Sequence, residues 1–285
     1  MKIGISGAGG YVGGNVLSQL ASRATDDQLV ALSRSLAVIP GIESRFADFD
    51  QPDSLEHAYH GLDRLLIIPG DNLEKGVIGA QLVHAIDAAL EAHVGHIYLL
   101  SAAHVKVAAF SDLGASYLNA EEHLKSHARH WTILRMNFYT ETFVQLAGPA
   151  IAQGVLTGLG EDKIALVSRD DVAQALAGAV SGNGQANATY ELTGPHSLSG
   201  EERARLLQDL TGKPVKYQVI SEQQLHSQLA GLPPYYASAA LSMQKAFALG
   251  AFDTVTADVE MLCGHAPAAA DEILRRVATD TTPRS

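Results

Sequence analysis

Short strand-like runs alternate with longer, helix-like segments over the first 135 residues. Runs at 2–6, 29–32, 44–48, 65–68, 97–100 and 131–135 predict strands. Segments 11–22, 76–93 and 115–127 carry apolar residues three and four positions apart, which predicts helices. The run at 65–68 ends at a Pro-Gly pair and is typical of a strand that is buried on both faces. This alternation predicts an α/β fold, namely a doubly wound parallel sheet of the Rossmann type.

The alternation loosens after residue 136. Runs at 164–167 and 190–192 predict strands, while Ser199 and Ser221 each precede a Glu or Gln by three positions, which predicts helix starts with capping boxes. The segment 231–238, which contains two prolines and two tyrosines, predicts a loop. We therefore expect a dinucleotide-binding domain over 1–135, with its sheet completed by 163–193. We expect residues 136–285 to form a smaller, partly interleaved C-terminal α/β substrate-binding region.

The composition is that of a globular protein, with 47% hydrophobic and 18% charged residues. A formal net charge of -11 argues against nucleic acid as the main partner. The single cysteine, Cys263, allows no intramolecular disulfide and fits a reducing compartment. Without a signal peptide or a long apolar run, we expect a cytoplasmic protein that does not enter membranes. The sequence leaves the oligomeric state open, a homodimer included.

Glycines gather where the first strand passes into the first helix. Gly7, Gly10 and Gly13 are spaced as in dinucleotide-binding loops, and Gly9 is an additional glycine. Gly7 would allow a tight turn, Gly10 a close approach to a pyrophosphate, and Gly13 tight packing of helix on sheet. The N–H groups and positive dipole end of the helix, beginning near Tyr11 and Val12, would hold the phosphates. We expect a nicotinamide dinucleotide cofactor here.

The end of the second strand indicates which cofactor binds. A site selective for NAD would carry an acidic residue there to bond the ribose 2′-hydroxyl. Here Ser33 is followed by Arg34, whose guanidinium can pair with a 2′-phosphate. We therefore expect NADP(H). Asp48, after the third strand, is either a contact to the adenine edge or an acid at a helix N-terminus.

Several motifs resemble the NmrA-like atypical short-chain dehydrogenases, and within them the type 2 quinone oxidoreductase and triphenylmethane reductase subgroup. The resemblance is carried over nearly the whole chain by segments 7–13, 33–34, 45–48, 65–68, 134–139, 168–173 and 190–194. It implies that Ile68 and Pro69 line the cofactor groove. It also implies that Asn137, Phe138 and Tyr139 face the nicotinamide and the substrate.

The Tyr-x-x-x-Lys pair of standard short-chain dehydrogenases is missing. Tyr117 is followed four positions later by Glu121, and a nearby carboxylate would raise the pKa of the tyrosine. Ser101 follows the fifth strand, at the usual place of the serine that polarises a carbonyl. Ser101, Tyr117 and Asn137 are the candidate catalytic residues, with Ser101 and Asn137 also candidate cofactor contacts. The alternative for Ser101 and Tyr117 is ordinary loop polarity.

Histidines and aromatic residues supply the remaining candidates. His104 lies beyond Ser101 and is a candidate substrate contact, together with Phe138 and Tyr139. Phe138, Tyr139 and Phe143 would form either an aromatic wall for a planar ring or a helix core. His123, His127 and His130 share a helical face, which we interpret as a solvated helix end and not as a metal site.

Hydride transfer to a quinone needs less help from a proton donor than reduction of a ketone, because the product anion is better stabilised. We therefore expect an NADPH-dependent oxidoreductase acting on a quinone or similar planar conjugated aromatic, including tailoring of aromatic natural products. The alternative is a non-catalytic NADP(H)-sensing regulatory protein, which would use the same binding motifs.

Overall fold

The computed structural model describes residues 1–23, 26–36, 39–72, 74–103 and 112–280. Its centre is a seven-stranded sheet in the order β3-β2-β1-β4-β5-β6-β9, in which all neighbouring strands are parallel. The strands are β1 (Lys2–Ser6), β2 (Gln28–Ser33), β3 (Glu43–Phe46), β4 (Arg64–Ile67), β5 (His96–Ala102), β6 (Trp131–Met136) and β9 (Ala188–Leu192). The predicted doubly wound sheet is confirmed.

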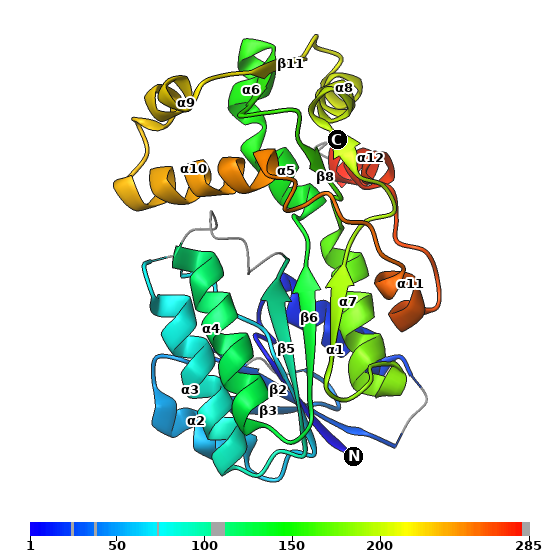
Figure 1. The fold of residues 1–285 in the computed structure, drawn as a ribbon. Helices are drawn as coiled ribbons and strands as arrows, with labels where there is room; N and C mark the ends of the chain where they lie inside the picture. The colour runs from blue at the N-terminus through cyan, green and yellow to red at the C-terminus, as the bar shows by residue number, and fades with distance from the viewer. Residues whose placement is uncertain (24–25, 37–38, 73, 104–111, 281–285) are drawn as a thin grey trace.

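Helices cover both faces of the sheet (Figure 1). One face carries α2 (Pro52–Tyr59), α3 (Val77–Glu91) and α4 (Asp112–His127), and the other carries α1 (Tyr11–Ala21), α7 (Arg169–Gly178) and α11 (Asp258–Cys263). Each layer of helices packs its apolar side on one face of the sheet. The central strands accordingly carry buried apolar residues on both faces. The crossover helices connect strands that all run parallel, so the loops that follow the carboxyl ends of the strands open at one edge.

The rest of the chain lies above that edge (Figure 1). It contains α5 (Thr140–Leu146), α6 (Gly148–Gln153), α8 (Gly200–Thr211), α9 (Glu222–Leu229), α10 (Pro234–Ala248) and α12 (Ala270–Asp280). Two small sheets pair β7 (Val155–Gly158) with β11 (Lys216–Val219) and β8 (Lys163–Ile164) with β10 (Leu198–Ser199). A short π-helical turn (Ala179–Asn183) extends α7. These elements have a core of their own around Phe143, Phe247 and Phe252.

The capping boxes expected for this upper part are confirmed, whereas the strand predicted over 164–167 is reduced to β8 (Lys163–Ile164) and one loop prediction is wrong. Capping boxes open α8 at Ser199 and α9 at Ser221, as the sequence predicts. The predicted loop over 231–238 is wrong in its second half, because α10 begins at Pro234. Proline is compatible with the first helical position, where its missing N–H is not needed.

Of the predicted range 163–193, residues 188–192 join the central sheet as β9 beside β6, whereas β8 pairs with β10 in a separate small sheet. The division of the chain at residue 135 into two domains stays a prediction. Within the part of the chain described above, no helix is both long enough and apolar enough to cross a bilayer.

Candidate functional site

The glycine loop turns sharply between β1 and α1. Gly7 has a φ of 64°, a left-handed conformation that side-chain-bearing residues rarely adopt. The N–H of Gly10 donates to the carbonyl oxygen of Gly7 over 2.9 Å, which closes the turn. A Cβ on Gly13 would lie only 2.3 Å from that same carbonyl oxygen. The helix therefore starts against the loop at a distance that only glycine permits.

The first turn of α1 is left open toward solvent. Gly10 is the N-cap, no side chain caps this end, and the first turn contains no acidic residue. Gly9 and Gly10 are exposed. N–H groups at such a helix start, reinforced by the helix dipole, bind phosphate groups. This local geometry fits the pyrophosphate of a dinucleotide.

A cavity of about 640 Å³ runs over the loop and along the carboxyl edge of the sheet. Every residue predicted for the cofactor groove, apart from Ser101 and Asn137, lines this cavity. These residues are Gly7, Gly9, Gly10, Tyr11, Val12, Arg34, Asp48, Ile68 and Pro69. The cavity thus joins the ends of β1, β2, β3 and β4 into one continuous site of the size that small-molecule ligands require.

Arg34 directly follows β2 and is exposed at the cavity wall. Among the residues that the structure describes, none forms an ion pair with its guanidinium. Its neighbours Ser33 and Ser35 are uncharged. The end of β2 therefore carries a cation at the place where an NAD site carries a carboxylate. The position suits a 2′-phosphate.

Asp48 has local partners that sequence reasoning did not anticipate. Its Oδ1 accepts from the N–H of Asp50 over 3.1 Å, and its Oδ2 accepts from the Gln51 amide over 3.0 Å. The carboxylate thereby holds the turn that leads into α2. Its role at the adenine edge stays a prediction.

Tyr11 and Arg169 connect the loop to α7. The hydroxyl of Tyr11 donates to Asp170 Oδ1 over 2.8 Å, and this hydrogen bond raises the pKa of Tyr11. Arg169 lines the cavity, and its guanidinium lies 5.6 Å from the centre of the Tyr139 ring. Arg169 was missed as a cavity residue, although the motif at 168–173 was the available signal. The helix start of α7 thus lies between the cofactor loop and Tyr139.

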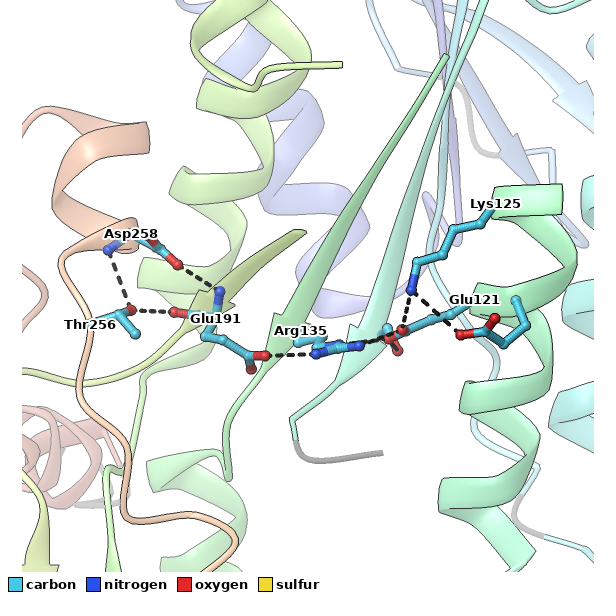
Figure 2. Close-up of polar contacts among 8 residues, drawn as sticks. Glu121, Lys125, Arg135, Glu191, Thr256 and Asp258 are labelled. Carbon is cyan, nitrogen blue, oxygen red and sulfur yellow. Dashed lines mark hydrogen bonds and ion pairs between the residues drawn. The ribbon is translucent and has the colours of Figure 1, made fainter. Parts of the chain in front are cut away.

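Ser101 lies in β5 and is fully buried. It belongs to a polar network whose other members include Glu121 and Arg135 (Figure 2). Its hydroxyl donates to Glu121 Oε1 over 2.7 Å. Arg135 donates to both oxygens of Glu121, over 2.8 and 2.6 Å, and to Glu191 over 2.9 Å. Burial acts to raise the pKa of Glu121, but the hydrogen bonds from Arg135 and Ser101 outweigh it and lower that pKa. Glu121, which sequence reasoning treated only as a missing lysine, is therefore an ionised partner of Arg135.

Tyr117 is buried on α4 within the apolar layer that covers the sheet. Burial raises the pKa of its phenol. The sequence suggested that Glu121 would cause such a shift, but the carboxylate of Glu121 binds Ser101 and Arg135 instead. A catalytic role for Tyr117 stays a prediction.

Asn137, Phe138 and Tyr139 follow β6 below the upper part of the chain. The Asn137 amide is buried, donating to the carbonyl oxygen of Phe252 over 3.3 Å and accepting from the N–H of Phe138 over 2.7 Å. Phe138 packs edge-on against Phe247, and the Tyr139 hydroxyl lies 2.8 Å from the sulfur of Met136. These three residues do not line the 640 Å³ cavity, so their predicted contacts to nicotinamide and substrate stay predictions.

Phe143 and His104 are the two remaining predicted positions, and the structure describes only the first. Phe143 is buried in the core of the upper part, which favours the helix-core alternative for this residue. His104 lies outside the described residues.

Comparison with known proteins extends this picture. The profile of the NAD(P)H-binding family matches residues 7–182, which is more than half of the chain. Quinone oxidoreductase 2 of Escherichia coli (strain K12) is 32% identical over 239 residues, which cover 81% of this chain and 82% of that protein.

Solved structures agree with the sequence relatives. The NADPH-dependent quinone oxidoreductase of Escherichia coli, complexed with NADPH, superposes with a TM-score of 0.88 at 28% identity, covering 96% of this chain and 99% of that one. The triphenylmethane reductase of Citrobacter sp., complexed with NADP(H), superposes with a TM-score of 0.85 at 26% identity, covering 97% and 99%. The resemblance seen in the sequence motifs is confirmed. The chain belongs to the NAD(P)H-binding family and is an NAD(P)H-dependent oxidoreductase related to quinone oxidoreductase 2 and triphenylmethane reductase.

Proposed function

We propose that this protein is an NADPH-dependent reductase of quinones or similar planar conjugated aromatics. Its similarity to quinone oxidoreductase 2 and to a reductase of triphenylmethane dyes supports this substrate class. Aromatic natural products with quinonoid rings fall within the same class. The proposal has two parts, the choice of cofactor and the choice of acceptor, and different residues support each.

Arg34 supports NADPH over NADH. It is the cationic side chain at the end of β2, it is exposed to the cavity, and it is not committed to an ion pair with any described residue. A guanidinium forms paired, charge-assisted hydrogen bonds with a phosphate. The same group has no equivalent partner on a ribose hydroxyl.

The observation that carries the choice of acceptor is the Glu121–Arg135 ion pair. Glu121 stands where a short-chain dehydrogenase has the lysine that lowers the pKa of the catalytic tyrosine. Here the carboxylate is neutralised by Arg135, and burial raises the pKa of Tyr117. Among the described residues, Tyr117 and Glu121 thus do not form the tuned donor that would protonate a strongly basic alkoxide. An acceptor whose reduced form is a stabilised anion does not need such a donor.

The proposed reaction balances without a protein acid. The bound cofactor supplies a hydride from its nicotinamide ring. The quinone takes up this hydride and one proton from water, which yields the hydroquinone and NADP⁺. The residues of the chain bind and orient the two reactants, with the open start of α1 and Arg34 holding the phosphates, so the rate gain comes mainly from positioning.

The test compares acceptors and cofactors in one assay. We expect NADPH oxidation with a panel of benzoquinones and naphthoquinones, and none with simple aliphatic ketones. Arg34→Ala should weaken NADPH binding about 10- to 100-fold with little effect on NADH, since a charge-assisted hydrogen bond contributes roughly 1.5–3 kcal/mol. Arg205→Ala, at an exposed position on α8, is the matched control.

Three outcomes contradict the proposal. Binding of NADPH without turnover of any quinone would favour the sensor alternative. Efficient reduction of aliphatic ketones would require a protein proton donor that we have not assigned. Equal loss of NADPH and NADH affinity in Arg34→Ala would remove the basis for cofactor choice.

A further inference from the structure

Arg169 is a cationic residue in the wall of the cofactor cavity that has no role in the reaction proposed above. It is the first residue of α7 and is half-buried. Its chain neighbours Ser168 and Asp170 do not line this cavity, so Arg169 reaches it through its side chain. Among the described residues that line the cavity, Arg34 and Arg169 are the two with cationic side chains.

The guanidinium of Arg169 is only partly occupied by protein partners. Its Nη2 donates to Thr142 Oγ1 over 3.2 Å, and its Cζ lies 5.6 Å from the centre of the Tyr139 ring. Nε and Nη1 donate to no described residue, and neither is among the buried polar atoms that lack a partner. These two nitrogens are therefore accessible to solvent, while the contacts with Thr142 and Tyr139 hold the side chain in place.

Two carboxylates lie close to Arg169, and both are engaged by other groups. Glu141 accepts from the backbone N–H of Arg169, over 3.1 and 3.2 Å, and not from its guanidinium. Asp170 accepts from the hydroxyl of Tyr11 over 2.8 Å. Because no described carboxylate forms an ion pair with the guanidinium, its positive charge remains available to an anionic ligand.

The position of Arg169 indicates which anionic group of the cofactor it meets. In the proposed function Arg34 holds the 2′-phosphate at the end of β2, on one side of β1 in the sheet. Arg169 lies on the side of β6, where Val167 bridges to Tyr139 and α7 begins beside the start of α1. The remaining phosphates of NADP(H) are those of the pyrophosphate. Of these, the phosphate on the nicotinamide ribose is the one farther from Arg34.

We propose that Arg169 binds the nicotinamide-side phosphate of the dinucleotide, with Thr142 and Tyr139 positioning its guanidinium. This role rests on the cofactor site of the proposed function. The start of α1 then holds the pyrophosphate through its N–H groups, and Arg169 supplies the cation that the glycine loop lacks. Because NADPH and NADH carry the same pyrophosphate, Arg169 contributes to the binding of both cofactors, whereas Arg34 distinguishes between them.

Calorimetry with ligands of increasing length locates the contact. Adenosine 2′,5′-bisphosphate lacks the nicotinamide-side phosphate, whereas 2′-phospho-ADP-ribose and NADP⁺ both contain it. We expect Arg169→Met to weaken binding of the two longer ligands about 10- to 100-fold, because a charge-assisted hydrogen bond to that phosphate is lost. Its affinity for adenosine 2′,5′-bisphosphate should stay within about twofold of the wild-type value. Arg34→Ala should instead weaken binding of all these ligands, since each carries the 2′-phosphate.

Further variants assign the effect to the guanidinium. Arg169→Lys keeps the charge but not the paired N–H groups, so it should lose less affinity for NADP⁺ than Arg169→Met does. Thr142→Val keeps the shape of the side chain and removes the acceptor of Nη2, so it should cause a smaller loss for the same two longer ligands. Arg205→Met, at an exposed position on α8, is the matched control and should change none of these affinities.

The outcomes separate the role of Arg169 from the proposed function. Unchanged NADP⁺ affinity in Arg169→Met would overturn the phosphate contact, and a raised KM for the quinone in the same variant would assign Arg169 to the acceptor instead. An equal loss for adenosine 2′,5′-bisphosphate would also overturn it. If Arg169→Met does not fold, Arg169→Lys and Thr142→Val decide by the same comparison of ligands. A wild-type protein that binds none of the ligands would contradict the proposed function itself.

Discussion

Removing Arg135 should leave the buried carboxylate of Glu121 without the guanidinium that balances its charge. Glu121 is fully buried, and Arg135 supplies two of the hydrogen bonds that it accepts (Figure 2). Ser101 and the more distant Lys125 amine, at 3.4 Å, would remain. Breaking a buried ion pair by removing one partner costs about 3–5 kcal/mol. We expect Arg135→Met to lose that much unfolding free energy, which corresponds to roughly 6–20 °C in melting temperature.

The loss should depend on pH in a direction that the pKa shift determines. In the wild type the pKa of Glu121 is lowered on folding, so its stabilising contribution is complete above the unfolded pKa and is lost as the pH falls through the folded value. Without Arg135, burial dominates and raises the pKa of Glu121 in the folded state. The deficit of Arg135→Met should therefore be greatest near neutral pH and should shrink as the pH is lowered toward 5.

Denaturant unfolding of four proteins at several pH values checks this reasoning. Adding Glu121→Gln to Arg135→Met removes the uncompensated charge and should recover part of the lost stability. Lys125→Met, whose amine lies 3.4 Å from Glu121 and is partly exposed, should cost less than about 1 kcal/mol. The opposite result is that Arg135→Met lowers the free energy of unfolding by less than about 1 kcal/mol, by the same amount at acidic and at neutral pH. That result would refute the conclusion that Glu121 is ionised and paired with Arg135.

Three further predictions address the loop, the proton donor and a helix start. Gly13→Ala places a methyl group 2.3 Å from the Gly7 carbonyl oxygen, so it should lower stability by about 1–3 kcal/mol and abolish tight NADPH binding in calorimetry. Gly14→Ala, with its nearest contact at 3.5 Å, should keep both. Tyr117→Phe should leave the pH profile of quinone reduction unchanged, whereas a catalytic phenol would show as a loss of the corresponding limb. Ser199→Ala removes one half of the capping box of α8 and should cost about 1 kcal/mol in thermal unfolding.

The sheet and the cofactor loop could be predicted from sequence because their signals are local. A buried parallel strand needs a continuous apolar run, as at 65–68, and a helix needs apolar residues at its own repeat. The loop at Gly7–Gly13 needs glycine for reasons of backbone geometry, so its residues identify it directly. Arg34 could be placed because it lies one residue beyond a strand whose end is recognisable.

The partners of polar side chains could not be predicted in this way. Ser101, Glu121 and Arg135 are distant in sequence and meet only because β5 and β6 pair in register and α4 packs beside them. The sequence therefore showed that Glu121 occupies the position of the usual lysine, but it did not show that Glu121 forms an ion pair with Arg135. Pro233 and Pro234 suggested a loop for a similar reason, because the helix that follows them depends on packing over the upper part of the chain.

The amino-acid sequence by itself determined the fold class and the position of the dinucleotide loop, and it supports the proposed choice of NADPH, since each depends on residues that are near one another along the chain. Only the tertiary structure decided which buried polar atoms find partners. It paired Glu121 with Arg135 and with Ser101. The physical reason is that a hydrogen bond or ion pair is a matter of ångströms between atoms, and such distances across a sheet are decided by packing and register.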